Sequence, residues 1–493
     1  MALAPSIKEQ AATVHPVGAA GSLATPVYSP MSVLRGMLEK KDYVAATAFA
    51  RKAVTQSPTD PAIWNALGLA LRAIGEAQSA AQCYQNALAI APRSAAIWSN
   101  LGNALVDSKK FALGLAAHER ARALAPDDAK VMYNHGLALA ANGSHVASLE
   151  LLNRTHEMMP DDPNVVWDRA RAHLHLGNYA RGWQDYEARL RTGHLPPRAL
   201  PGAPWDGQPY RGKRLLILSE QGFGDAIWVA RWLPAVKALG GTLIVEARRE
   251  LVSLFEQQSF ADRIVAKGDS LPDADFHLHQ CSLPKLFARS ASTISSRPYL
   301  RIHEAHARRF AEIFDDRRQG LRVGIVWSGS VTFKGNSDRA QPLQPFLDWF
   351  DMPGVRLFSL QKGPPEVELR AIGSERAVDL SLHLKDFADT AAALMHLDLV
   401  VMTDSAVAHL AGALGRPVWV LLGKNAHWLW SPETDRTLWY QTMRLFRPKA
   451  WGDWRTVFDH AAAALLKLQP TNAISSQTAE LEKYIERHEP SEY

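Results

Sequence analysis

A proline that returns at a fixed interval is the strongest constraint on how this chain can fold. Pro58, Pro92, Pro126 and Pro160 each stand 34 residues from the next. A period of this length is typical of solenoids, in which small helical units stack and each unit contacts only its neighbours. Because proline cannot continue a helix, it marks the end of each unit. The period therefore predicts a stack of two-helix units in the first part of the chain.

Small and aromatic residues recur in register with these prolines. In the second unit, Trp64 and Gly68 fall on the first expected helix, and Ala80 and Tyr84 fall on the second. Small residues let two helices approach closely, whereas the aromatic rings fill the space between units. The pattern resembles the tetratricopeptide repeat and predicts about five repeats over residues 27–193. The resemblance implies a concave surface for a peptide or protein partner, although such an array can also be a spacer or a dimer surface.

The composition of the 493 residues is typical of a globular protein with more than one domain. A net charge of +5 is too small and too dispersed to indicate a nucleic-acid partner, and no apolar run approaches the ~20 residues of a membrane span. Cys83 and Cys281 cannot by themselves build a disulfide framework or a zinc site, which fits a reducing compartment. Residues 1–26 lack the apolar core of a secretory signal, so we expect a disordered leader on a cytoplasmic protein.

Residues 194–210 are rich in proline and glycine, and we expect a linker there or a loop packed on the next domain. Beyond them, short apolar runs alternate with helical patterns, as in parallel sheets covered by helices. We expect two Rossmann-like lobes, over residues 211–310 and 320–470, and a polar tail over 471–493. The predicted fold class is therefore α + α/β, with a repeat solenoid before a two-lobed region. The expected strands lie at 214–218, 242–247, 322–329, 355–361, 397–404 and 417–423, and residues 274–284 fit a strand together with a loop. The clearest helices are expected at 225–239 and 454–468.

The turn "EQGFGD" follows the first of these strands. Gly222 and Gly224 suggest a dinucleotide fingerprint, and Glu246 stands where a ribose-binding acid would lie. However, Ile227 replaces the third glycine of that fingerprint, and the carboxylate of Asp225 would repel a pyrophosphate. An NAD-dependent dehydrogenase is therefore disfavoured.

Asp225 fits two other roles at this position. Its carboxylate can act as a general base that accepts a proton from an acceptor hydroxyl. It can instead cap the helix that follows, a role worth about 0.5–2 kcal/mol. The residues of the turn leave both interpretations open.

The stretch "MTDSAVAHLAGALG" has the features of a diphosphate site. A buried strand ends in Thr403, Asp404 and Ser405, and a helix of small residues begins at Ala406. The free N–H groups at such a helix start bind phosphate, and small residues let the helix lie close to the sheet. His409 is four residues after Ser405 on the same helix face, within reach of a phosphate or sugar oxygen. The alternative is an Asp/Ser cap followed by a buried histidine.

Taken together, "GFGDAIWVARWLP" and "MTDSAVAHLAGALGRPVWVLLG" resemble the heptosyltransferase-like glycosyltransferases. The stretches "SEQGFGD", "VGIVWSGS", "SLQKG" and "MRLF" resemble bacterial members of that group that also carry tetratricopeptide repeats. The resemblance implies a two-lobed GT-B fold that transfers a sugar from a nucleotide-diphosphate donor, with no metal and no other cofactor. It also implies that Asp225 is the catalytic base and that residues 404–409 bind the donor diphosphate. Direct attack by the acceptor hydroxyl would invert the anomeric carbon.

In the same group, basic or polar side chains from the loop after the first strand of the second lobe contact the donor phosphates. Here that loop is residues 328–339, with Lys334 and Arg339 as candidates and Lys362 as a weaker one. Positive charge is needed there because the departing nucleotide diphosphate gains negative charge. Ala340 replaces a serine found in fused relatives, and the alternative is an exposed loop without a ligand.

Trp428 and Trp430 lie in an aromatic-rich segment of the second lobe and are candidates for stacking on a base or sugar. Tryptophans in such places more often pack between lobes, because they bury a large apolar area.

The repeats favour a protein or peptide as the acceptor. Flagellin or another surface protein is the example that the architecture of similar fusions suggests, and a saccharide or lipid-linked acceptor is the other option. The alternative function is a scaffold, in which the repeats bind a protein partner and the transferase region is inactive. The presence of Asp225, Lys334, Arg339 and His409 disfavours this alternative.

Overall fold

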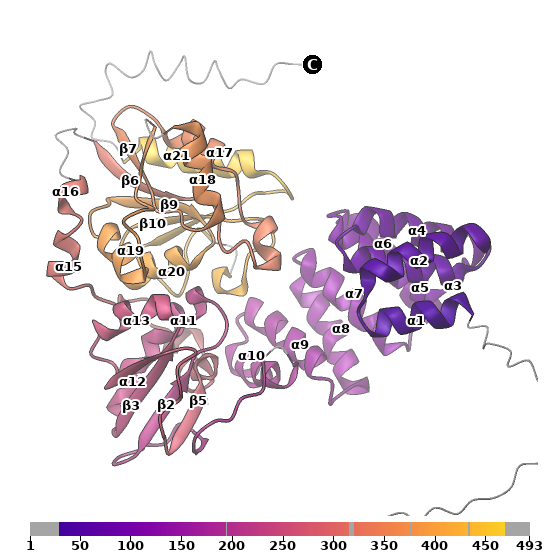
Figure 1. The fold of residues 1–493 in the computed structure, drawn as a ribbon, viewed down its shortest axis with the longest axis horizontal. Coiled ribbons are helices and arrows are strands. Elements are labelled where there is room, and N and C mark those ends of the chain that lie inside the picture. The colour runs from indigo at the N-terminus through magenta and orange to yellow at the C-terminus, as the bar shows by residue number, and fades with distance from the viewer. Residues whose placement is uncertain (1–28, 194, 315–319, 374–375, 432–433, 469–493) are drawn as a thin grey trace, which may run out of the picture. The chain divides into compact units, whose positions relative to one another are not determined.

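The computed structural model describes residues 29–193, 195–314, 320–373, 376–431 and 434–468. The predicted leader (1–26) and polar tail (471–493) lie outside these residues. The chain divides into two compact units, Met1–Leu124 and Ala125–Tyr493, and the division falls inside the predicted repeat array. Figure 1 follows the chain through both units by colour.

The described part of the first unit consists of helical hairpins with the predicted spacing. A Cβ atom on Gly68 would lie 2.6 Å from the ring of Tyr84, so only glycine lets the two helices of that hairpin approach so closely. The Trp64 indole donates to the Pro58 carbonyl at 2.8 Å, and the Trp98 indole donates to Pro92 at 2.9 Å. The tryptophan and proline that repeat together are therefore bonded to each other. The helices are α1 (Pro30–Glu39), α2 (Tyr43–Gln56), α3 (Pro61–Ala73), α4 (Ala77–Ile90), α5 (Ala95–Asp107) and α6 (Phe111–Leu124).

The second unit begins with helices of the same kind, which confirms the predicted solenoid. They are α7 (Ala129–Ala141), α8 (His145–Met158), α9 (Pro163–His175) and α10 (Tyr179–Tyr186). The second helices of the earlier hairpins, α2, α4, α6 and α8, each have 14 residues. By contrast, α10 has only 8 residues and continues as a 3-10 helix, η1 (Glu187–Arg191). The last repeat thus changes shape where it meets the α/β region.

A parallel sheet with the strand order β1-β5-β2-β3-β4 follows the solenoid. The strands predicted at 214–218 and 242–247 are confirmed to the residue. No apolar pattern predicts β4, because only one of its residues is buried. β1 lies within the predicted linker, where Ala203 pairs with Phe276. The strands are β1 (Ala203–Pro204), β2 (Arg214–Leu218), β3 (Thr242–Ala247), β4 (Arg263–Ala266) and β5 (Phe276–His279).

The single helix predicted over residues 225–239 is wrong, because the structure divides it into three pieces. Pro234 is the second residue of the last piece and has no N–H group to bond to the preceding turn, so the chain tightens before it. The pieces are α11 (Phe223–Val229), η2 (Ala230–Trp232) and α12 (Leu233–Ala238). The lobe continues with α13 (Arg249–Glu256), η3 (Gln280–Ser282), α14 (Leu283–Phe287), η4 (Ala291–Thr293), α15 (Glu304–Arg308) and α16 (Ala311–Phe314).

A second parallel sheet has the order β11-β10-β9-β6-β7-β8. Helices α17 and α21 cover one face, where Ile325 of β6 packs with Phe346 and Phe458, and α19 and α20 cover the other, where Met402 packs with Leu410 (Figure 1). The strands are β6 (Leu321–Val326), β7 (Val355–Ser359), β8 (Ala377–Asp379), β9 (Leu399–Thr403), β10 (Val418–Leu421) and β11 (Met443–Phe446). The helices are η5 (Lys334–Asp338), α17 (Leu343–Phe350), η6 (Pro364–Glu366), α18 (Val367–Ile372), α19 (Phe387–Leu394), α20 (Ala406–Ala413), η7 (Trp428–Trp430) and α21 (Trp454–Leu466).

The solenoid followed by a parallel-sheet α/β region confirms the predicted fold class. Within the described ranges, no helix combines the length and the apolar character needed to cross a bilayer.

Candidate functional site

The second sheet has a point at which its strand order reverses. The chain lays down β6, β7 and β8 in one direction and then returns to place β9 on the other side of β6. The loops that leave the carboxyl ends of β6 and β9 therefore diverge, and parallel sheets bind ligands at such a point. The predicted donor-binding residues, except Lys362, lie on these two loops or on the end of β9 and the start of α20 that the second loop joins.

Two amide side chains hold the loop after β6 in shape. Gln361 Oε1 accepts hydrogen bonds from the N–H groups of Trp327 at 3.1 Å and Ser328 at 2.9 Å. Asn336 Oδ1 accepts from the N–H of Gly329 at 3.1 Å, and its Nδ2 donates to Ser328 Oγ at 3.0 Å. Neither amide was predicted as a site residue. Gln361 lies in the "SLQKG" stretch after β7, but a single sequence does not reveal that its side chain bonds the loop after the neighbouring strand, β6.

Arg339 is the predicted cation that this loop brings to the reversal point. Its Nη1 lies 3.4 Å from Asp404 Oδ2, and the guanidinium sits over the ring of Phe333, 4.7 Å from the centroid. The side chain is 25% exposed, and its buried Nε has no hydrogen-bond partner among the described residues. The two predicted donor segments therefore meet through an ion pair that leaves donor capacity unused.

The two predicted lysines differ from Arg339. Lys334 opens η5, and its side chain lies outside the part that the structure describes. Lys362 Nζ donates to the Ser381 carbonyl at 2.7 Å and lies 3.7 Å from the Glu366 carboxylate. Lys362 therefore contacts the segments that follow β7 and β8, and its contact with a donor stays a prediction.

Two buried hydroxyl groups at the end of β9 lack partners among the described residues. Thr403 is fully buried and Ser405 is 8% exposed, yet Thr403 Oγ1 and Ser405 Oγ make no hydrogen bond there. Ser405 occupies the N-cap position of α20, but its side chain accepts no bond from the helix, which begins at Ala406. The cap expected in the alternative interpretation is thus absent at Ser405. Both hydroxyls remain able to bond a ligand oxygen or water.

His409 is buried inside the lobe contact and is a neutral side chain. Its Nδ1 lies 2.9 Å from the Tyr440 hydroxyl, and its ring stacks on Trp430 with 5.1 Å between centroids. Burial lowers the pKa of His409 to about 3, although the nearby Asp404 carboxylate acts in the opposite direction. If His409 contacts a phosphate or sugar as predicted, it does so as a neutral imidazole. The contact itself stays a prediction.

Asp225 lies in the first turn of α11. Its Oδ2 accepts a hydrogen bond from the N–H of Gly222 at 3.0 Å, which is the geometry of a helix cap. Burial raises the pKa of Asp225 to about 6, against the effect of that hydrogen bond, and the charges of Glu220 and Asp404 raise it further. A carboxyl group with a pKa so close to neutral can take up a proton near physiological pH. The predicted cap is therefore wrong in position, because the helix begins at Phe223 and its N-cap residue is Gly222, but Asp225 still bonds the start of the helix as its third residue. This bond does not conflict with a role as a base.

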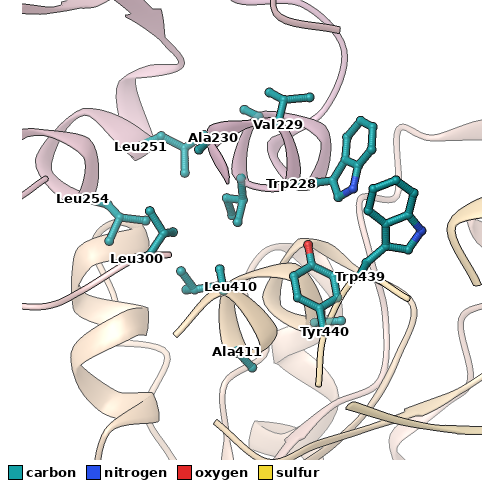
Figure 2. Close-up of a cluster of buried hydrophobic side chains, with 14 of the residues drawn as sticks. Trp228, Val229, Ala230, Leu251, Leu254, Leu300, Leu410, Ala411, Trp439 and Tyr440 are labelled. Carbon is teal, nitrogen blue, oxygen red and sulfur yellow. The ribbon is translucent and has the colours of Figure 1, made fainter. Parts of the chain in front are cut away.

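The two glycine- and alanine-rich motifs face each other. A Cβ atom on Gly224 of α11 would lie 2.8 Å from His409 Cδ2 of α20 and 3.6 Å from the Cα of Ala406. Figure 2 shows buried apolar side chains between the same two helices, with Trp228 and Val229 on one and Leu410 and Ala411 on the other. The small residues therefore bring the start of α11 against the start of α20, so that Asp225 and the Asp404 segment share one site.

A polar network fixes this contact, and apart from His409 none of its members was predicted from the sequence. The Arg231 guanidinium donates to the carbonyls of Ser295 and Trp439, each at 3.1 Å, and lies 4.8 Å from the centre of the Tyr440 ring. Tyr299 donates to the Ile227 carbonyl at 2.9 Å and approaches Tyr440 at 3.5 Å. Because Tyr440 also reaches His409, the network ties α11 of one lobe to α20 of the other.

The two candidate stacking tryptophans are almost completely buried. Trp428 is 4% exposed and packs edge-to-face on Trp183, Trp228 and Trp439, with ring centroids 5.2, 5.5 and 6.2 Å away. Trp430 is 1% exposed and stacks on His409. This placement corresponds to the packing role, and stacking on a ligand stays a prediction.

Glu246, the candidate ribose-binding acid of a dehydrogenase, is already occupied. Its carboxylate accepts two hydrogen bonds from Arg198 at 2.9 and 3.1 Å and one from the N–H of Ser219 at 2.9 Å. It is 1% exposed. These contacts add a physical reason against a dinucleotide site in the first lobe.

Comparison with family models divides the chain in the same way as the fold. Residues 68–109 match the model described as TPR repeat, and residues 99–163 match that of the tetratricopeptide repeat. Residues 363–442 match glycosyltransferase family 9 (heptosyltransferase), a range that includes Asp404 and His409 but not Asp225 or Arg339. The chain thus carries tetratricopeptide repeats in its N-terminal region and a family 9 domain toward its C-terminus.

Individual proteins are similar to this chain over part of its length. Protein FlbA of Caulobacter vibrioides is 30% identical over 327 residues, which is 60% of this chain and 54% of FlbA, so the match spans about half of that relative. Among solved structures, PilF of Pseudomonas aeruginosa is 21% identical, with a TM-score of 0.31 over 34% of this chain and 76% of its own. MamA of Desulfovibrio magneticus is 18% identical, with a TM-score of 0.29 over 33% of this chain and 92% of its own.

Proposed function

We propose that this protein is a glycosyltransferase of the GT-B type that moves a sugar from a nucleoside-diphosphate sugar to an acceptor hydroxyl. The donor diphosphate binds at the reversal point of the second sheet, against Arg339 and the start of α20. The acceptor lies on the side of the first lobe, next to Asp225. The family 9 match over residues 363–442 supports the class of reaction.

The contact between Gly224 and His409 is the single observation that carries the proposal. It joins two motifs that lie 185 residues apart in the sequence (409 − 224). One motif supplies a carboxylate with a pKa raised to about 6, and the other supplies unpartnered hydroxyls at a helix start. A base and a phosphate-binding segment in one place are what transfer from a diphosphate to a hydroxyl requires.

The chemistry follows from these positions. Asp225 accepts the proton of the acceptor hydroxyl while that oxygen attacks the anomeric carbon of the sugar. The bond between this carbon and the diphosphate oxygen breaks, and the nucleoside diphosphate leaves with the electron pair, so the anomeric configuration inverts. Arg339 lies where the leaving group gains negative charge, and its free Nε can donate to that group without a metal ion.

The proposed acceptor is a protein or peptide, such as flagellin or another surface protein, recruited by the repeats. The combination of a repeat solenoid with a transferase region is the basis for this part of the proposal, because solenoids offer extended binding surfaces.

A thermal-shift screen tests the proposal. The ligands are UDP, GDP, ADP, CMP, their common sugar conjugates and NAD, and binding to the native state raises the melting temperature. We expect one nucleoside diphosphate or its sugar to stabilise the wild type and to lose this effect in Arg339→Gln.

Arg444→Gln is the matched control for this screen. Arg444 also lies over a ring, 4.8 Å from the centre of Phe446, and near a carboxylate, 3.6 Å from Asp435 Oδ2, but on the edge strand β11. It should keep the ligand response. A folded wild type that responds to none of these nucleotides would reject the proposal and favour the scaffold.

A further inference from the structure

The turn between β2 and α11 has a backbone conformation that its residues do not favour. Gln221 has φ = +56°, in the left-handed region that glycine adopts easily and glutamine does not. Such a conformation persists only where the surroundings impose it. The turn matters because Asp225 follows it and is bonded to the N–H of Gly222.

Side chains from the last tetratricopeptide repeat impose this conformation from one side. The Tyr186 hydroxyl, at the end of α10, bonds both ends of the Gln221 amide, at 3.1 Å to Nε2 and 3.3 Å to Oε1. Tyr186 is only 6% exposed, so this contact is made in the interior.

Arg189 of η1 holds the preceding residue, Glu220. Its Nε and Nη2 donate to the two carboxylate oxygens of Glu220 at 3.1 and 2.7 Å. The remaining donors of Arg189 reach Ser282 Oγ at 2.8 Å and Glu187 Oε1 at 2.7 Å. Arg189 and Glu220 are 4% and 1% exposed, and the N–H of Cys281 also bonds Glu220 at 2.8 Å. The turn is therefore anchored to the repeat by a two-pronged ion pair that water does not reach.

The first lobe holds the turn from the other side. Arg248 donates to the Gln221 carbonyl from Nε at 3.1 Å and from Nη2 at 2.5 Å. Arg189 of η1 is thus hydrogen-bonded to Glu220, the backbone connects Glu220 through Gln221 to Gly222, and the N–H of Gly222 is hydrogen-bonded to the carboxylate of Asp225.

The shape of the last repeat fits this role. Where the earlier second helices run for 14 residues, α10 stops after 8 and tightens into η1, the segment that carries Arg189. Among the second helices of the described hairpins, α10 departs from the length of 14 residues, and its hairpin is the one that contacts the turn.

We propose that the last repeat is a positioning element of the active site, in which Arg189 and Tyr186 set the place of the Asp225 carboxylate. The repeats would then be required for transfer even to a small acceptor that they do not bind. The role of Asp225 as base rests on the proposed function, whereas the bonds that hold the turn do not depend on it.

The test compares Arg189→Lys and Tyr186→Phe with Arg169→Lys as a matched control. Arg169 forms a similarly buried two-pronged pair with Asp185, at 2.7 and 3.0 Å, in the same repeat, and this pair includes none of the residues of the turn. Lysine keeps the charge at each site and loses the forked geometry. We expect kcat to fall about tenfold or more in Arg189→Lys and Tyr186→Phe, with the KM for the donor within about twofold of wild type. Arg169→Lys should transfer at the wild-type rate.

Hydrogen exchange across residues 219–229 gives a readout that does not need activity. Exchange there should increase in Arg189→Lys and Tyr186→Phe and stay unchanged in Arg169→Lys. Equal loss of kcat in the two lysine variants, or wild-type transfer by a folded Arg189→Lys, would overturn the positioning role. If the wild type transfers no sugar, the proposed function fails, and exchange alone decides: unchanged exchange in Arg189→Lys overturns the inference.

Discussion

The two sheets of the α/β region reverse their strand order in the same way, but the two reversal points are filled differently. In the first sheet, the loops after β2 and β5 close around Glu220, which Arg189 neutralises with two short hydrogen bonds. In the second sheet, the loops after β6 and β9 meet through a single bond of 3.4 Å between Arg339 and Asp404. Arg189 is 4% exposed, whereas the Arg339 side chain is 25% exposed.

The difference teaches where a ligand can bind in a molecule with two similar lobes. Topology provides a crevice at both reversal points. At the first, the donors of Arg189 are all bonded by the protein's own groups, so this cation has none left for an incoming phosphate, although the buried Ser219 Oγ and His279 Nδ1 also lack partners among the described residues. The second keeps an unbonded Arg339 Nε and the hydroxyls of Thr403 and Ser405. Buried polar groups without partners are costly, and a ligand that bonds them removes that cost.

The largest expected effect comes from the carboxylate that stands between the two points. Asp225→Asn should lower transfer by about 10²–10⁴-fold, because asparagine cannot accept the acceptor proton. The fold should be kept, since the amide oxygen can still accept the bond from Gly222. Transfer is measured with the donor identified in the ligand screen. Asp128→Asn is the control, because Asp128 also caps a helix, at 2.9 and 3.0 Å from the N–H groups of Lys130 and Val131. Near-normal transfer by a folded Asp225→Asn would mean that the cap is its only role.

A stability measurement tests whether the first reversal point is closed and the second open. Arg189→Met should destabilise the protein by about 3–5 kcal/mol, because it leaves the Glu220 carboxylate buried without its partner. Arg339→Met should cost no more than about 1 kcal/mol, since its pair with Asp404 is partly exposed. Urea unfolding of both variants gives the two values. Equal losses of unfolding free energy in the two variants would show that the first reversal point is not more closed than the second.

The pH dependence of stability sharpens the same comparison. The pKa of Asp225 rises from 3.8 to about 6 on folding, so the folded protein holds a proton that the unfolded chain releases. The contribution of Asp225 to the free energy of unfolding is full below pH 3.8 and is lost as the pH rises through about 6. Asp225→Asn lacks this loss, so it should exceed the wild type by up to about 3 kcal/mol above pH 6 and match it below pH 3.8. Unfolding free energies at both pH values check the sign, and a variant that is less stable at neutral pH would contradict it.

The sequence predicted features that repeat or that lie close together along the chain. The 34-residue period, the buried strands β2 and β3, and the motif around Asp404 each depend on local pattern, and the structure has the predicted elements there. Features that depend on distant partners were not predictable. Arg189 is one arginine among many until the fold brings it to Glu220, and Tyr440 reaches His409 across 31 residues. Over residues 225–239 a local pattern misled the prediction: the apolar periodicity predicted one continuous helix, whereas the structure has three pieces and Pro234 stands at the start of the last one.

The smallest expected effect comes from Gly224, at the contact between α11 and α20. Gly224→Ala would put a methyl group 2.8 Å from His409 Cδ2, closer than carbon atoms pack, so α11 must move away from α20. We expect a loss of about 1–3 kcal/mol in unfolding free energy, together with weaker donor binding, because the displaced His409 belongs to the donor segment. Gly36→Ala is the control in another helix: a Cβ atom there meets nothing within 4 Å, so alanine should be neutral or stabilise by about 0.5–1 kcal/mol. If Gly224→Ala behaved like Gly36→Ala, the two lobes would not be held as closely as the contact of Gly224 with His409 requires, and the base and the donor segment would not share one site. A loss of stability with unchanged donor affinity would instead separate the lobe contact from the donor site, and would leave His409 with a packing role only.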